Sequence, residues 1–278
     1  MNIDASVQNA LDKKLNVYFI ATADKNMNIV KRDVVPANPG CDCYSVAKAY
    51  TALGVGICCD RGLISPDTKI TDVLHKYLPL DIDNKWHKVT VDHLLRHRSG
   101  IKNCLLDIDD LDASHFDTAD YLKIVFSQNV EETPGEYFRY TDDVFYLLSR
   151  AVAEVSGENL TDLLRQPLLE TMRFKEFAWS VCPHGYAMGG TGLYLRTEDM
   201  VKLGALYLRG GDWNGTRIVS EDWIKKSVER CYGFDSNENG LALKGGMRGQ
   251  ILGIDFNNYI TFAYHGFGKY KMTDIIVD

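Results

Sequence analysis

Two side chains at the head of a long apolar segment have the types and spacing of a catalytic pair. Ser45 and Lys48 lie three residues apart, where residues 47–59 have the apolar composition of a buried helix. Residues three apart share a helix face, so the hydroxyl and the amine can meet. Lysine can activate a serine as its base when burial and the helix N-terminus lower the lysine pKa. The pair therefore indicates nucleophilic catalysis, with backbone N–H groups at the helix start available to an oxyanion.

The spacing by itself is weakly specific. A serine that caps a helix or is solvated, followed by a surface lysine, produces the same pattern and is the commoner arrangement. Ser99 and Lys102 repeat the spacing, but Gly100 lies between them and no apolar run follows. The sequence therefore predicts a turn at this second pair.

Three other groups of side chains have metal-binding types in incomplete patterns. Cys41 and Cys43 have no further cysteine or histidine pair to complete a site. His93 and His97 lack the glutamate of a zinc-protease motif, so we expect them to pack within the fold. The six aspartates of residues 107–120 lack the glycine and terminal glutamate of an EF-hand, which favours a solvated acidic loop. We therefore predict no metal and no cofactor.

Composition excludes several classes of partner. The chain is 45% hydrophobic and 25% charged, as in ordinary soluble globular proteins, and its net charge of −7 argues against nucleic acid and anionic membranes. No stretch approaches the length of a membrane span, and the first residues lack the features of a signal peptide. With no export signal, the seven cysteines predict reduced thiols in a cytoplasmic protein, unless a leader has been trimmed.

Strand patterns lie at both chain ends, and helical patterns fill the middle. After a predicted helix over residues 3–14, the β-rich segments 16–22 and 28–35 predict a hairpin, and three more strands are expected over 240–246, 250–255 and 259–264. Further helices are expected over residues 89–97, 117–128, 143–155, 160–172, 198–209 and 220–231. This order predicts an α+β fold, in which one antiparallel sheet built from both chain ends is flanked by helices and carries a mainly helical insertion.

Several further motifs follow Ser45-x-x-Lys48 in order. They are Val91-Asp-His-Leu-Leu-Arg-His-Arg-Ser-Gly-Ile, Tyr140-Thr-Asp142, Gly189-Gly-Thr-Gly-Leu with Thr197-Glu-Asp-Met, Trp213-Asn-Gly-Thr-Arg-Ile-Val-Ser, and Gly246-Met-Arg-Gly-Gln. Over residues 16–264 this series resembles the serine β-lactamases and penicillin-binding proteins, closest to the class C β-lactamase and esterase branch. The resemblance implies a β-lactamase/transpeptidase-like fold. We expect residues 1–60 and 188–278 to form the sheet domain and residues 61–187 the helical domain, with the active site at their interface.

The resemblance also implies a role for each motif residue. Ser45 would attack an ester or amide carbonyl, and Lys48, deprotonated or paired with the Tyr140 phenol, would take its proton. Tyr140 would pass a proton to the leaving group and help to activate the deacylating water. The backbone N–H groups of Ser45 and Met247 would form the oxyanion hole.

The substrate-binding residues implied by the resemblance are Asp142, Lys244, Gly245 and Gly246, and two of these positions depart from the family. Asp142 stands where the family has asparagine, so two N–H donors are lost and a charge is added that can pair with Lys48 or Lys244. The third motif is Lys244-Gly-Gly246 rather than Lys-Thr-Gly, which puts recognition of a β-lactam carboxylate in doubt. His265-Gly266 fits this motif less well, because it falls after the Gly246–Gln250 match.

Two functions follow from these residues. The first is a serine hydrolase acting on a small-molecule ester or amide, with β-lactams and D-amino-acid peptides among the candidates. The second is a catalytically impaired relative that binds a ligand or partner. The sequence does not specify an oligomeric state or a substrate.

Overall fold

A computed structural model describes residues 1–277 of the chain, apart from the side chain of Ala113. The chain divides into two compact units. Unit 1 contains residues 1–46, 167–178 and 193–278, and unit 2 contains residues 47–166 and 179–192. The π-helical segment Gln166–Thr171 and the short strand β4 (Ala178–Trp179) lie where the chain passes between the units.

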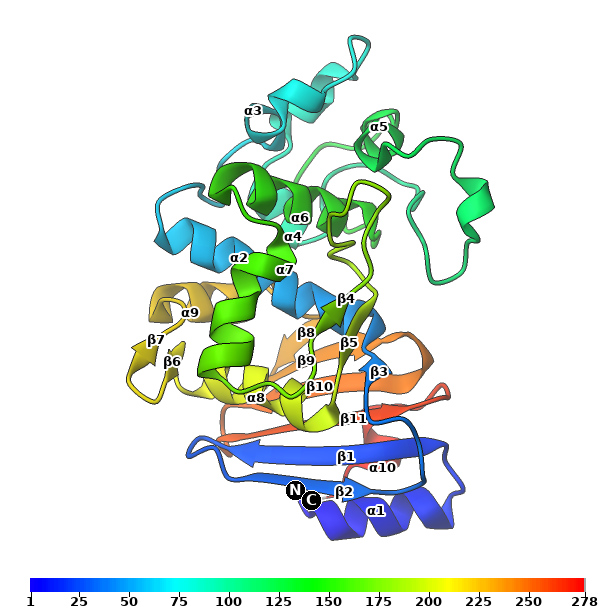
Figure 1. Cartoon of the computed structure of the whole chain (residues 1–278), viewed down its shortest axis with the longest axis vertical. Helices are drawn as coiled ribbons and strands as arrows, with labels where there is room; N and C mark the ends of the chain where they lie inside the picture. The colour runs from blue at the N-terminus through cyan, green and yellow to red at the C-terminus, as the bar shows by residue number, and fades with distance from the viewer. Residues whose placement is uncertain (278) are drawn as a thin grey trace. The chain divides into compact units, whose positions relative to one another are not determined.

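Unit 1 is built on a six-stranded antiparallel sheet with the strand order β2-β1-β11-β10-β9-β8 (Figure 1). Its strands are β1 (Val17–Asp24), β2 (Ile29–Asp33), β8 (Ser236–Glu238), β9 (Leu241–Gly246), β10 (Gln250–Asp255) and β11 (Ile260–Gly266). The N-terminal strand β1 pairs with the C-terminal strand β11, with Ile20 opposite Tyr264. The expected sheet made from both chain ends is therefore confirmed, as is the α+β fold.

Helices cover both faces of this sheet. They are α1 (Ile3–Asp12) with α10 (Met272–Ile275), and α8 (Thr197–Leu208); unit 1 also contains α9 (Glu221–Glu229). Tyr264 packs with Ala10 of α1 and Ile275 of α10, whereas Thr261, three residues earlier on β11, faces Gly204 of α8. Since successive side chains of a strand alternate between faces, α8 lies opposite α1 and α10.

Unit 1 also holds the segment that leads to Ser45. Strand β3 (Cys41–Asp42) pairs with β5 (Leu193–Leu195), and the 3₁₀ turn η1 (Tyr44–Val46) follows. A small hairpin joins β6 (Asp212–Trp213) to β7 (Thr216–Arg217), and the 3₁₀ turn η6 (Met247–Gly249) connects β9 to β10.

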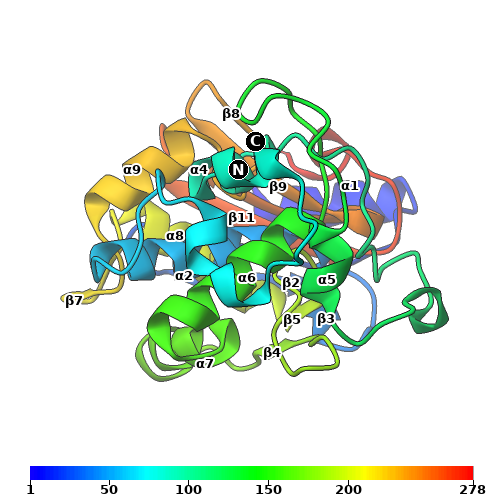
Figure 2. The ribbon, with the colours of Figure 1, turned by 90° about the horizontal axis from the view of Figure 1, so that it is seen from above.

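Unit 2 is mainly helical. It contains α2 (Ala47–Asp60), α3 (Ile70–Val73), α4 (Val91–Leu95), α5 (Tyr121–Phe126), α6 (Asp143–Ser156) and α7 (Leu160–Arg165), with 3₁₀ turns at His75–Tyr77, Asn84–Lys88 and Ala113–His115. Helix α2 packs against α6 and α7 (Figure 2). Helix α2, which was expected in the sheet domain, packs on α6 and α7 and clusters with unit 2.

Three local predictions differ from the structure for identifiable reasons. The helix expected over 160–172 is α-helical only to Arg165, because Pro167 cannot donate the next backbone hydrogen bond. The helix expected over 117–128 begins at Tyr121, where the Asp120 side chain caps it. Strand β8 was not anticipated, although the positive φ angles of Asn239 and Gly240 suit the tight hairpin turn that such a dipeptide favours.

Candidate active site

The first turn of helix α2 contains a lysine, Lys48, that is completely removed from solvent. The α-helix begins at Ala47, so Ser45 lies in η1 just before it and Lys48 lies in its first turn. Every residue of α2 from Ala47 to Cys58 is buried, as the sequence predicts, and Lys48 is 0% exposed. A buried ammonium needs compensating partners, and unit 2 supplies them.

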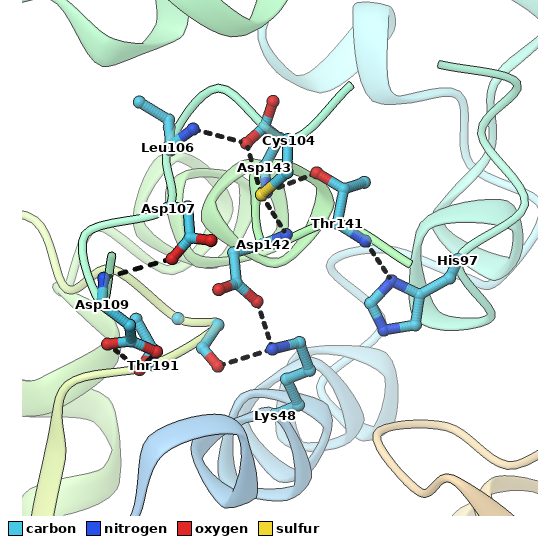
Figure 3. Close-up of polar contacts among 12 residues, drawn as sticks. Lys48, His97, Cys104, Leu106, Asp107, Asp109, Thr141, Asp142, Asp143 and Thr191 are labelled. Atoms are coloured by element: carbon cyan, nitrogen blue, oxygen red, sulfur yellow. Dashed lines mark hydrogen bonds and ion pairs between the residues drawn. The ribbon is translucent and has the colours of Figure 1, made fainter. Parts of the chain in front are cut away.

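Three groups in unit 2 surround the Lys48 ammonium, and Figure 3 shows its contact with one of them, Asp142. Its Nζ forms a short ion pair with Asp142 Oδ1 and donates to the carbonyl oxygen of Gly190 at 2.7 Å. The Nζ also lies 4.7 Å from the centre of the Tyr140 ring. Asp142 is itself 7% exposed, so this is a desolvated pair rather than a surface contact. The structure thus brings together Lys48, Tyr140 and Asp142, which were predicted from distant motifs.

The surroundings of Lys48 have opposite effects on its pKa. Burial by itself lowers the pKa of the ammonium, whereas the Asp142 carboxylate and the Tyr140 phenol raise it. The net result is a pKa above the ordinary value of lysine. Burial was expected to lower the pKa of Lys48 and make it a ready base, and the Asp142 carboxylate reverses the direction of that shift.

Tyr140 is held by an aromatic contact that the sequence analysis did not assign. Its ring stacks on His97 at 4.4 Å between centroids and 24° between planes, and the tyrosine remains 45% exposed. The Thr141 N–H donates to His97 Nδ1 (Figure 3). The Arg139 N–H donates to the His97 carbonyl. His97 therefore orients the Tyr140 segment. The sequence feature that could have indicated this contact is the position of His97 within the Leu-Leu-Arg-His-Arg-Ser-Gly motif.

Part of the acidic loop turns toward Asp142. Carboxylate oxygens of Asp107, Asp109 and Asp142 lie within 4.8 Å of one another, and Thr191 Oγ1 lies 2.8 and 2.7 Å from the two oxygens of Asp109. Burial and the nearby Asp142 charge raise the pKa of Asp107. The loop was expected to be solvated, and Asp107 and Asp109 depart from that expectation. Folding half-buries them, because Asp107 lies near Asp142 and Asp109 accepts a hydrogen bond from Thr191.

A cavity of about 510 Å³ lies beside this loop in unit 2. Its lining is mixed, with one apolar and one polar set of side chains and Cys104. The apolar residues are Leu105, Leu111, Phe116 and Ile124, and the polar ones are His115, Asp117, Thr118, Lys123 and Ser127. The Cys104 sulfur accepts the backbone N–H of Asp142, and Asp143 accepts the N–H of Leu105 and of Leu106. The cavity is therefore anchored to the first turn of α6, next to Asp142.

Unit 1 brings together the other predicted residues. The turn η1, which contains Ser45, packs against β9 and β10, the strands that flank Met247. A side chain at Gly246 would collide with the carbonyl oxygen of Cys43, so this position requires glycine. Lys244 is 2% exposed, and its Nζ pairs with Asp235, which also accepts the Gly245 N–H at 2.7 Å.

The weaker motifs take structural roles. Lys102 forms a surface ion pair with Glu131, and Gly100 has a φ of 91°, so the second Ser–Lys pair lies in a turn as predicted. His93 Nδ1 accepts the Thr90 N–H in a capping box at the start of α4. All seven cysteines lie within residues 1–277 and are free thiols.

The sequence matches one protein family over most of its length. The family model described as Beta-lactamase covers residues 35–265. The esterase EstB of Burkholderia gladioli is 28% identical over 138 residues, which are 45% of this chain and 35% of the esterase. A protein of Alkalihalophilus pseudofirmus is 26% identical over 201 residues, 65% of this chain and 52% of that protein. The chain thus matches about half or less of the length of these relatives.

Solved structures with the same fold cover nearly the whole chain. A Bacillus anthracis protein described provisionally as a 6-aminohexanoate-dimer hydrolase superposes with a TM-score of 0.80 at 14% identity, over 95% of this chain and 77% of that one. At this identity the likeness establishes the fold alone. In residues 1–277, no helix is long and apolar enough to cross a membrane.

Proposed function

The chain belongs to the beta-lactamase family, and from this premise we propose that it is a serine hydrolase that forms an acyl-enzyme on small esters or amides. The observation that carries the proposal is the lysine of the Ser-x-x-Lys motif, fully buried at the start of α2 with the Tyr140 ring 4.7 Å from its ammonium. Lysine is rarely kept wholly out of water unless it is paired, and the groups around this ammonium, Tyr140 and Asp142, both come from the predicted second motif.

The proposed reaction begins with attack of the Ser45 oxygen on the substrate carbonyl. A C–O bond forms, the carbonyl π electrons move to its oxygen, and the Ser45 proton passes to the neutral form of Lys48. When the tetrahedral intermediate collapses, Tyr140 gives a proton to the leaving alcohol or amine and is reprotonated from Lys48. Water then hydrolyses the acyl-enzyme by the reverse sequence of proton transfers.

Residues of unit 1 would stabilise the oxyanion and bind substrate. We propose the N–H groups of Ser45 and Met247 as the oxyanion donors, because η1 packs against the strands that flank Met247. We propose that Gly245 and Gly246 contact the substrate through their backbone, because the space of a side chain at Gly246 is filled by the Cys43 carbonyl. Lys244 is paired with Asp235, so we propose that it acts on the substrate through its charge and through the position of β9.

An ester or simple amide fits the substrate features better than a β-lactam. The third motif lacks the hydroxyl that helps the family to hold a β-lactam carboxylate, and Asp142 adds negative charge where the family has an amide. We propose that the cavity next to the Cys104 segment receives the acyl group, because Leu105, Leu111, Phe116 and Ile124 form an apolar part of its lining beside polar residues such as Asp117 and Lys123. EstB is named as an esterase, which agrees with this choice.

The second candidate is a ligand-binding relative with impaired catalysis. The Lys48–Asp142 pair favours it, because this pair holds the lysine in its protonated form, which cannot accept the serine proton. In the hydrolase that we propose, only the small fraction of neutral Lys48 is active at pH 7.

Intact-mass measurement separates the two candidates. Wild type and Ser45→Ala are incubated with a fluorophosphonate and, separately, with a penicillin. We expect a phosphonate adduct on wild type and none on Ser45→Ala, with weak or absent penicillin labelling. A stable adduct with both probes would identify an enzyme that recognises β-lactams. The absence of an adduct with either probe would instead support the binding protein.

A further inference from the structure

A row of three buried side chains runs from the start of α8 to the segment that carries Ser45. The Oγ1 of Thr197 lies 2.7 Å from His265 Nδ1, and His265 Nε2 lies 3.5 Å from the Cys43 sulfur. Cys43 and His265 are 0% exposed and Thr197 is 1% exposed. All three belong to unit 1, on α8, β11 and the link between β3 and η1.

The chemistry of this row is that of a neutral hydrogen-bonded chain. Burial lowers the pKa of His265 to about 3 and raises the pKa of the Cys43 thiol, so neither group is charged near pH 7. A neutral imidazole has one donor and one acceptor nitrogen, which allows it to satisfy the hydroxyl on one side and the thiol on the other. The row is therefore not a reactive thiolate–imidazolium pair. Because its three side chains are buried and neutral, we assign them a structural role.

Cys43 connects this row to the predicted nucleophile, two residues further along the chain. The Cys43 N–H donates to the Leu193 carbonyl at 2.7 Å, and its own carbonyl oxygen packs on Gly246, where no Cβ fits. The side chain, the N–H and the carbonyl of Cys43 are thus each held by a different element. Cys43 fixes both the start of η1 and its distance from the end of β9.

Tyr44, between Cys43 and Ser45, has a strained backbone. Its φ is +46°, a left-handed conformation that an aromatic residue rarely adopts. The Tyr44 N–H donates to Asp42 Oδ1 at 2.7 Å, which supports the turn from one side. A strained residue keeps such a conformation only when its neighbours hold it there, and Cys43 is the neighbour that is locked into the core.

We propose that Thr197, His265 and Cys43 are positioning residues that hold Tyr44 in its left-handed turn and thereby set Ser45 against the Met247 end of β9. The inference rests on the proposed role of Ser45 as the nucleophile. Loss of the His265–Cys43 contact lets Tyr44 relax to an ordinary φ. Ser45 then turns away from the proposed oxyanion donors while the rest of the sheet stays folded.

The test compares how fast a fluorophosphonate labels Ser45 in a set of variants. Cys43→Ala, His265→Asn and Thr197→Val each remove one member of the row. We expect Cys43→Ala and His265→Asn to lower the second-order labelling rate about tenfold or more, since small misplacements of reacting groups cost that much. The Thr197→Val variant also leaves Cys43 and Ser45 unchanged, which keeps the test available if Cys43→Ala does not fold.

Two comparisons separate positioning from ordinary loss of stability. Thr261→Val removes a buried hydroxyl on the same face of β11, where Thr261 Oγ1 donates to the Gly253 carbonyl, and it should lower the melting temperature without slowing labelling. Tyr44→Gly relieves the strain, because glycine adopts positive φ freely. In the Tyr44→Gly background we therefore expect Cys43→Ala to slow labelling less than about threefold, which is a non-additive result.

The outcomes distinguish failure of the inference from failure of the proposed function. The inference is overturned if the three variants slow labelling no more than Thr261→Val at an equal loss of melting temperature, or if Tyr44→Gly fails to rescue Cys43→Ala. Labelling of Ser45→Ala at the wild-type rate would instead show that Ser45 is not the nucleophile. That result would remove the proposed function together with the inference.

Discussion

Lys48 and Asp142 form an ion pair that is almost wholly shielded from solvent, with Lys48 0% and Asp142 7% exposed. The pair joins the first turn of α2 to the start of α6 within unit 2. Asp142 occupies the position where the resemblance places asparagine, and its carboxylate raises the pKa of Lys48. Its consequences for catalysis and for stability can be measured separately.

Asp142→Asn should move the pH dependence of catalysis toward neutrality. The Asp142 carboxylate raises the pKa of Lys48, and the proposed base is the neutral amine. In wild type, kcat/KM for an ester should therefore still rise above pH 9. Removal of the carboxylate should shift this rise to a pH lower by about one unit or more. Asp107→Asn, which removes a charge that faces Asp142 rather than Lys48, is the matched control. If the rise of kcat/KM in Asp142→Asn occurred at the same pH as in wild type, Asp142 would not control the pKa of Lys48.

Removal of Lys48 alone should destabilise the fold strongly. Lys48→Met leaves the Asp142 carboxylate buried beside Asp107 and without its cation, which costs about 3–5 kcal/mol. The double variant Lys48→Met/Asp142→Asn should recover at least half of this loss. Urea denaturation measures the free energy of unfolding.

The control for this loss is the surface pair of Lys102 and Glu131, whose side chains are 43% and 47% exposed. Lys102→Met should cost less than about 1 kcal/mol. If Lys48→Met were as mild as Lys102→Met, the pair would not be desolvated as the structure has it.

The cavity beside Asp142 should determine preference for acyl length. Ile124→Trp narrows a space of about 510 Å³ on the apolar part of its lining, so long acyl groups should lose more than short ones. We expect kcat/KM for p-nitrophenyl octanoate to fall about tenfold while that for the acetate stays within about twofold. Ile124→Leu, which conserves volume, should leave both values unchanged. Equal losses on both esters would mean that the cavity does not receive the acyl group.

His265 should make the protein lose stability in acid. Burial lowers its folded pKa to about 3, against about 6.5 when unfolded. Between these values the unfolded chain binds a proton that the folded chain excludes, so stability falls by about 1.4 kcal/mol for each pH unit of acidification below pH 6. Urea denaturation at each pH from 7 to 4 gives the free energy of unfolding. Its slope against pH should correspond to about one proton fewer taken up on unfolding in His265→Gln than in wild type. Identical slopes would show that His265 does not titrate with unfolding.

The motifs and the sheet were predictable because they depend on local sequence. Alternating apolar residues at both chain ends predicted one antiparallel sheet, and the pairing of β1 with β11 confirms it. Three other features could be recognised from the sequence for the same reason. They are the spacing of Ser45 and Lys48, the Tyr140-Thr-Asp142 motif and the apolar character of α2. Short-range periodicity reports which face of an element is buried.

The partners of the buried charges were decided only by tertiary structure. The sequence allowed Asp142 to pair with Lys48 or Lys244, and folding directs it to Lys48 while Asp235 takes Lys244. The stacking of His97 on Tyr140 and the contact of Cys43 with His265 join residues 43 and 222 positions apart. Such contacts depend on how elements pack, and a pKa depends on the charges that packing brings within a few ångströms. The chain by itself therefore determined which chemical groups are present, and the fold determined which of them carry charge and where they are held.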